Sequence, residues 1–213
     1  MIGAALGVTA ASLVAGLAAN AGGADWAVAL RPWLDADDNG RLPVAFEALC
    51  LFGAGLACVL VWHDGKGTAG TRSGHWAGLA VLFALLGAEK AVGLHELAAA
   101  AVSAQYGTFR GGLMGTFVIP AVAVLALLAW AYREFVKSLP AATIRGLAWG
   151  WALLLGCGIG LELVAAVWIK MTGGGDAIQV LLANAEEAGE MIGAAILFRV
   201  LWRHARGAPI PPS

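Results

Sequence analysis

Residues 145–170 read RGLAWGWALLLGCGIGLELVAAVWIK, and the length and composition of this stretch decide the fold class. Between the flanking Arg145 and Lys170, the only charged side chain is Glu162. A helix needs about 20 mostly apolar residues to cross the hydrocarbon core of a bilayer. This stretch therefore predicts a transmembrane helix.

The composition of the whole chain points the same way. Of the 213 residues, 60% are hydrophobic and only 13% are charged, whereas soluble domains carry about 25% charged residues. This composition predicts an integral membrane protein in contact with the lipid bilayer. The net charge of −1 and the scattered Lys and Arg residues leave no basic face for nucleic acid, which excludes nucleic-acid binding.

Five further apolar runs are long enough to span a membrane and are bounded by charged residues, Gly or Pro. We therefore predict an all-α polytopic membrane protein with six transmembrane helices in one bundle. Residues 1–206 form this single domain, and residues 207–213 form a flexible tail. The predicted spans are 2–21, 44–62, 76–102, 116–132, 144–171 and 177–202.

The distribution of Lys and Arg predicts the orientation of these spans. With six spans, both termini and the connectors 63–75 and 133–145 share one side, which carries eight Lys and Arg residues against four on the other side. Cytoplasmic connectors are the ones enriched in Lys and Arg. We expect both termini in the cytoplasm.

The connector before the second span contains an acidic hexapeptide at residues 35–40, DADDNG. It matches the start of a calcium-binding loop, in which alternate side-chain oxygens converge on the ion. The match then fails, because the twelfth position is Phe46 and Glu47 falls one residue late. A solvated acidic turn before a helix that starts at Pro43 is the favoured interpretation, and calcium binding is the alternative.

Most charged residues lie in connectors, so the charged and titratable residues inside the spans are informative. A charged, unpaired carboxylate inside the hydrocarbon costs at least about 2.5–3.5 kcal/mol, so these groups should face the bundle interior and have partners or a use. The third span carries Glu89, Lys90, His95 and Glu96, the fifth carries Glu162, and the sixth carries Glu186, Glu187 and Glu190.

Helical geometry brings these groups toward one place. Glu89 and Glu96 are seven residues apart, so in a continuous helix they lie within about 20° of each other. Glu186, Glu187 and Glu190 occupy one arc of the sixth helix. The helical rise places carboxylates of three spans between the midplane and the outer leaflet, which predicts one shared site.

The charges of this site restrict its chemistry. Six carboxylates face one lysine and one histidine, so the excess negative charge requires protonated carboxyl groups or a bound cation. Oxygen ligands with a single imidazole favour Mg, Mn, Fe or Zn. The candidate ligands are Glu89, His95, Glu96, Glu162, Glu186, Glu187 and Glu190, with Lys90 as an internal counter-charge.

Small residues on the fifth span favour close helix packing. Gly146 with Gly150, and Gly156 with Gly160, are two pairs of glycines spaced four residues apart. Such pairs let neighbouring transmembrane helices approach closely.

Residues 33–202 resemble a group of largely uncharacterised bacterial multi-pass membrane proteins. The resemblance rests on the outer Asp/Asn loop that leads through Pro43, on His95-Glu96 six residues after an acidic residue, on Glu162 within Gly-x-x-Leu-Glu, and on Glu186-Glu187-x-x-Glu190-Met191. It implies a multi-pass protein of the bacterial inner membrane. Those relatives commonly have Asp-Glu where this chain has Ala88-Glu89, so one potential ligand is absent here.

Three functions fit this arrangement. The cluster binds a metal cation or protons for ion-coupled transport or sensing. Alternatively, the chain is a membrane-embedded, metal-dependent enzyme that acts on a lipid or a quinone. In the third interpretation it is a structural or assembly subunit whose polar cluster fixes helix register. Homo-oligomer formation is compatible with all three.

Overall fold

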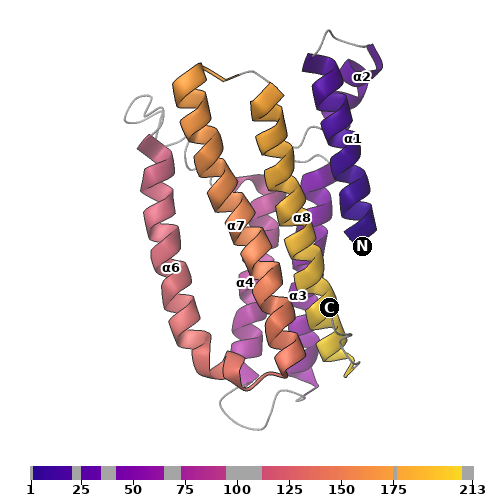
Figure 1. Ribbon diagram of the computed structural model, residues 1–213. Helices are drawn as coiled ribbons and strands as arrows, with labels where there is room; N and C mark the ends of the chain where they lie inside the picture. Colours follow the sequence, from indigo (N-terminus) through magenta and orange to yellow (C-terminus); the bar gives the residue numbers. More distant parts are fainter. Residues whose placement is uncertain are drawn as a thin grey trace.

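The computed structural model describes residues 2–20, 25–34, 42–64, 73–94, 112–174 and 177–207. This part of the chain is all-α, as predicted, and contains seven helices (Figure 1). They are α1 (Ile2–Asn20), α2 (Asp25–Leu34), α3 (Leu42–His63), α4 (Ser73–Val92), α6 (Gly112–Lys137), α7 (Ala141–Thr172) and α8 (Ala177–Ala205).

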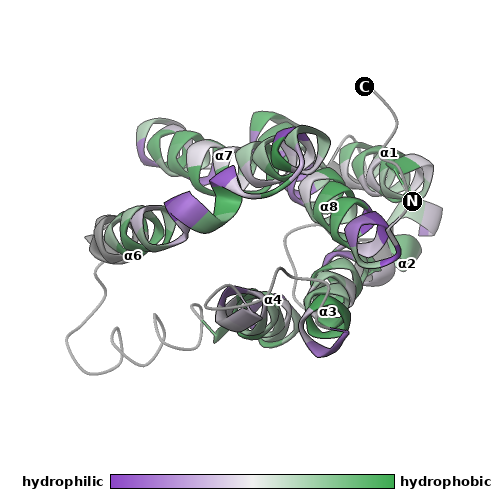
Figure 2. Ribbon diagram, turned by 90° about the horizontal axis from the view of Figure 1, so that it is seen from below, coloured by the Kyte–Doolittle hydropathy of each residue, from purple (hydrophilic) through white to green (hydrophobic). Residues whose placement is uncertain are grey.

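The long helices run side by side along one axis. Viewed from below, α6, α7, α8 and α1 follow one another in an arc, and α3 and α4 lie across from it (Figure 2). Helix α8 is central to this arrangement, because it packs against α7, α3 and α1. The lower end of the bundle in Figure 1 contains the end of α3, the start of α4 and the α6–α7 turn.

Three of the helices are long and apolar enough to cross a membrane, judged by length and composition: α3, α4 and α7. The other three predicted spans coincide with α1, α6 and α8, and the apolar part of α1 is the shorter stretch Ile2–Ala18. Large apolar side chains are exposed on the helices, as is typical of helices that face lipid. Examples are Leu127 (62% exposed), Trp149 (65%) and Val167 (58%).

Helix α4 ends at Val92, whereas the predicted third span continues to residue 102. Gly93 follows with φ of 64°, and its N–H donates a hydrogen bond to the carbonyl oxygen of Glu89 at 2.7 Å. This left-handed conformation disfavours residues with a Cβ, so glycine is suited to end a helix here. The helical phase that relates Glu89 to Glu96 therefore stops at Gly93.

Two other predictions concern segments that the structure describes only in part. The connector before the second span contains α2, which packs on α1. The acidic hexapeptide, residues 35–40, lies outside the described residues. The predicted tail, residues 207–213, also lies outside them except for Gly207.

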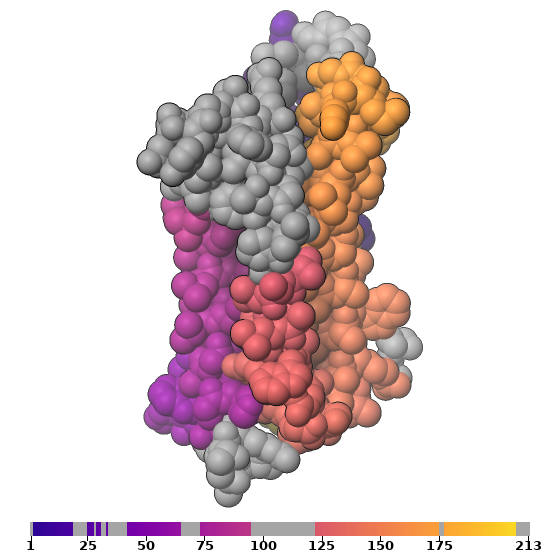
Figure 3. Space-filling view, turned by 90° about the vertical axis from the view of Figure 1, so that its left-hand side faces the viewer, coloured from indigo at the N-terminus to yellow at the C-terminus, as the bar shows by residue number. Residues whose placement is uncertain are grey.

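Aromatic rings fill the lower half of the bundle. The Trp76 ring lies 5.0 Å from the rings of both Phe135 and His204, measured between centroids, and Phe83 stacks on Trp151 at 5.4 Å. Helices α4 and α6 lie side by side here (Figure 3), where the Tyr132 hydroxyl donates to a carbonyl of α4. We call these five residues the aromatic layer: Trp76, Phe83, Phe135, Trp151 and His204.

Glycines bring α7 and α8 into close contact. A Cβ on Gly146 or Gly150 would meet Val200 or Leu197 of α8, so the first predicted pair does pack against a neighbouring helix. The second pair does not, because a Cβ on Gly156 or Gly160 would meet no atom of the described residues within 4 Å.

Candidate cation site

Three carboxylates from two helices converge near the middle of α8. Glu47 extends from α3, and Glu187 and Glu190 extend from α8. Each offers one oxygen, and these oxygens all lie within 4.8 Å of one another. We call Glu47, Glu187 and Glu190 the carboxylate cluster.

Glu47 is the most deeply buried member of the cluster. It lies on the second turn of α3, on the buried face that also carries Val44, Ala48 and Leu51, and its side chain is 0% exposed. Its Oε1 atom has no hydrogen-bond partner in the described part of the chain. A buried polar atom without a partner costs about 1–3 kcal/mol, and more when charged, so this oxygen is suited to accept a proton or bind a cation.

Lys90 links the three helices that surround the cluster. Its Nζ lies 3.3 Å from Oε2 of Glu47 and donates a hydrogen bond to the Glu190 carboxylate. The Lys90 side chain comes from the last turn of α4 and is 21% exposed. The predicted counter-charge therefore contacts one predicted ligand, Glu190, and one residue outside the predicted set, Glu47.

Gly158 of α7 makes room for Glu190. A Cβ at position 158 would overlap the Glu190 carboxylate, and Glu190 is only 7% exposed. Gly158 is the glycine of the Gly-x-x-Leu-Glu motif. Its function in the structure is thus to let α7 cover the carboxylate cluster.

Three other predicted ligands are described, and none of them belongs to the group of oxygens within 4.8 Å of one another. Glu186 is half-buried on α8 and interacts electrostatically with both Glu190 and Glu162. Glu162 on α7 and Glu89 on α4 are also half-buried, and each takes part in a polar or electrostatic interaction. His95 and Glu96 lie outside the described residues.

Glu47 is absent from the predicted ligands, although the sequence carries a signal for it. Glu47 is the only charged residue in the second predicted span, 44–62. The same rule that selected Glu162 in the fifth span, a single ionisable residue in an apolar run, selects Glu47.

The donor set of the cluster is restricted to oxygen. No imidazole or thiol belongs to the group of described residues that could share one ion. Three ionised carboxylates carry three negative charges, and Lys90 supplies one positive charge. The cluster can therefore hold a hard cation or protons.

Residues 5–205 match a protein family over most of the chain. The chain belongs to the family described as Domain of unknown function (DUF8692). The match includes Glu47, Lys90, Glu187 and Glu190. Neither the search of curated proteins nor the search of solved structures found a match. Function is therefore argued from the chemistry of the cluster.

Proposed function

We propose that this chain is a six-span protein of the bacterial inner membrane that binds a metal cation or protons at the carboxylate cluster and couples this binding to ion transport or sensing. The observation that carries the proposal is the convergence of fully buried Glu47 with Glu187 and Glu190. Helices α3 and α4, which provide Glu47 and Lys90, are both candidate membrane spans.

The number of charges supports a use beyond packing. A lysine and one carboxylate would suffice for an ion pair between helices, and even such a pair is often no better for stability than apolar residues of similar size. Two further carboxylates add negative charge that must be neutralised inside the membrane. An exchangeable cation or exchangeable protons supply that positive charge.

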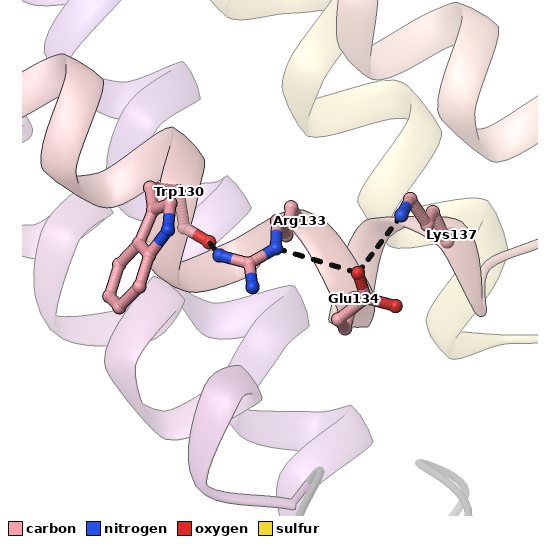
Figure 4. Close-up of polar contacts among 4 residues, drawn as sticks. All are labelled: Trp130, Arg133, Glu134 and Lys137. Carbon is pink, nitrogen blue, oxygen red and sulfur yellow. Dashed lines mark hydrogen bonds and ion pairs between the residues drawn. The ribbon is translucent and has the colours of Figure 1, made fainter.

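The lower end of the bundle has the features of a cytoplasmic membrane interface. On α6, Arg133 lies over the Trp130 ring at 4.9 Å and contacts Glu134, which Lys137 also contacts at 2.9 Å (Figure 4). The hydrogen bond from Lys137 lowers the pKa of the exposed Glu134 carboxyl. Trp beside Arg and Lys is typical of the interfacial region, and excess positive charge favours the cytoplasmic side.

Reconstitution into liposomes tests the proposed function. Purified protein is placed in vesicles that contain a Mn²⁺-quenched dye or a pH-sensitive dye, and uptake is compared between the wild type and Glu47→Gln/Glu190→Gln. Binding of Mn²⁺ or protons is measured on the same samples. Glu134→Gln, which removes an exposed carboxylate, is the matched control.

We expect the double variant to lose about tenfold or more of the flux or binding of the wild type, and the control to keep it, because only the buried carboxylates lie in a low dielectric. A folded double variant with wild-type flux and binding would overturn the proposal. A wild type that neither moves nor binds Mn²⁺ or protons would also overturn it.

A further inference from the structure

Glu47 is the member of the cluster whose oxygens lack hydrogen bonds. Its Oε2 lies 3.3 Å from the Lys90 ammonium as an ion pair, and neither Oε1 nor Oε2 has a hydrogen-bond partner among the described residues. Because the Glu47 side chain is 0% exposed, bulk water does not solvate Oε1. An unsolvated carboxylate without hydrogen bonds is suited to bind a cation beside it.

The geometry and the donor atoms restrict which cation fits. Oxygen atoms bound to one Mg²⁺, Mn²⁺ or Ca²⁺ ion lie about 2.0–2.6 Å from it, so two of them are at most about 5 Å apart. The three cluster oxygens lie within 4.8 Å of one another. Zn²⁺ and Fe²⁺ sites usually include imidazole or thiolate, and among the described residues neither group joins the three carboxylates.

Lys90 contacts the two carboxylates that such an ion requires. Its ammonium group bonds to Glu47 and Glu190 at once, so it lies where an ion shared by these two residues would bind. A divalent ion and an ammonium group within about 4 Å of each other repel strongly in a medium of low dielectric. Both cannot occupy this position together.

Lys90 has the kind of side chain that movement out of this position requires. It is unbranched and flexible, and its side chain is 21% exposed, whereas the side chains alone of Glu47 and Glu190 are 0% and 10% exposed. The carboxylates are therefore the fixed part of the site, and the ammonium is the movable part.

Building on the proposed function, we infer that the carboxylate cluster takes a hard divalent cation and that Lys90 is a tethered competitor for the same position. The ion binds when the Lys90 ammonium moves out, and it is released when the ammonium returns. Lys90 thereby keeps the affinity low enough for the ion to exchange. This deepens the proposed function by naming the ligand class and the residue that controls its release.

Neutralising Lys90 provides the test. Binding of Mn²⁺ to the full chain in detergent is measured by the loss of the electron paramagnetic resonance signal of free Mn²⁺. The variants are Lys90→Met and Lys90→Gln, each alone and combined with Glu47→Gln. Lys137→Met removes an exposed lysine outside the cluster and is the matched control.

We expect Lys90→Met or Lys90→Gln to bind Mn²⁺ about tenfold or more tightly than the wild type, because a competing positive charge has been removed. Adding Glu47→Gln should abolish this gain, and Lys137→Met should bind as the wild type does. Because two different neutral side chains replace Lys90, the test does not depend on the folding of one variant.

The outcomes separate this inference from the proposed function. Folded Lys90 variants that bind Mn²⁺ as the wild type does, or more weakly, overturn Lys90 as a competitor, while the proposed function stands. If the wild type moves protons, but neither the wild type nor any variant binds Mn²⁺, the proposal of a divalent ligand is overturned and proton coupling remains. Absence of both flux and binding overturns the proposed function itself.

Discussion

Gly193 of α8 lies against the backbone of Leu154 of α7. A Cβ added to Gly193 would lie 2.6 Å from the backbone nitrogen of Leu154 and 2.8 Å from the carbonyl oxygen of Gly150. These are backbone atoms within a helix, so they cannot rotate away as a flexible side chain would. The two helices can approach this closely only with glycine at position 193.

Gly193→Ala should therefore push α7 and α8 apart. We expect a loss of about 1–3 kcal/mol in the free energy of unfolding, as for other overpacked interiors. Thermal unfolding in detergent measures it. Gly156→Ala is the control, because a Cβ there meets nothing within 4 Å, and alanine favours helix. Equal unfolding temperatures for both variants would contradict this account.

The ion pair between Lys90 and Glu190 predicts non-additive effects on stability. Glu190→Leu leaves the Lys90 ammonium with fewer partners, which costs about 3–5 kcal/mol for a buried pair. Adding Lys90→Met removes that ammonium and should recover part of this loss, but not all of it, because Glu47 also loses the cation that it contacts. Chemical unfolding of the two single variants and the double variant measures the coupling. Additive losses would show that the pair is not coupled.

His204 predicts a loss of stability at acidic pH. This residue lies beyond the sixth predicted span, its ring stacks on Trp76, and burial lowers its pKa below the ordinary value of 6.5. In the unfolded chain this histidine becomes protonated below about pH 6.5, whereas its lower pKa in the folded protein disfavours protonation. Unfolding therefore becomes more favourable as the pH falls.

The measurement compares unfolding temperatures at about pH 7.5 and about pH 5.5. The wild type should lose more stability on acidification than His204→Gln, which has no titratable group at this position. An identical decrease in both proteins would assign the pH dependence to other residues.

Gly173 should resist replacement although there is space around it. It caps the C-terminus of α7 with φ of 88°, and its N–H donates to the Ile169 carbonyl at 2.9 Å. A Cβ there meets nothing within 4 Å, so the cost of Gly173→Ala is conformational, about 1–2 kcal/mol. Gly173→Asn should cost less, because asparagine tolerates this conformation. Equal stability of the two variants in thermal unfolding would contradict this explanation.

The apolar runs predict the positions of helices well, because a lipid-embedded helix must be apolar over most of its length. The run at 144–171 corresponds to α7, and the run at 44–62 corresponds to α3, each within three residues at either end. The prediction fails where one residue changes the backbone. Gly93 ends α4 because its backbone adopts the left-handed conformation, and hydropathy alone does not predict that conformation.

The composition of the site was harder to predict, because it depends on which helices are neighbours. Glu187 and Glu190 were candidates from their arc on one helix, and Lys90 was the expected counter-charge. Glu47 joins them because α3 packs against both α4 and α8, and periodicity along one helix does not reveal that packing. Among the described residues, Glu162 is not part of the group within 4.8 Å, although it interacts electrostatically with Glu186.

The aromatic layer limits the passage of ions through the bundle. Phe83 and Trp76 precede Lys90 on α4 by about 10 Å and about 21 Å, and both rings are 1% exposed. An ion that passed between these rings would lose most of its hydration shell, and moving a bare charge into such a medium costs tens of kcal/mol. The aromatic layer is therefore a barrier to ions between the carboxylate cluster and the lower end of the bundle. We expect negligible ionic conductance through this arrangement of the helices, despite the charges in their interior.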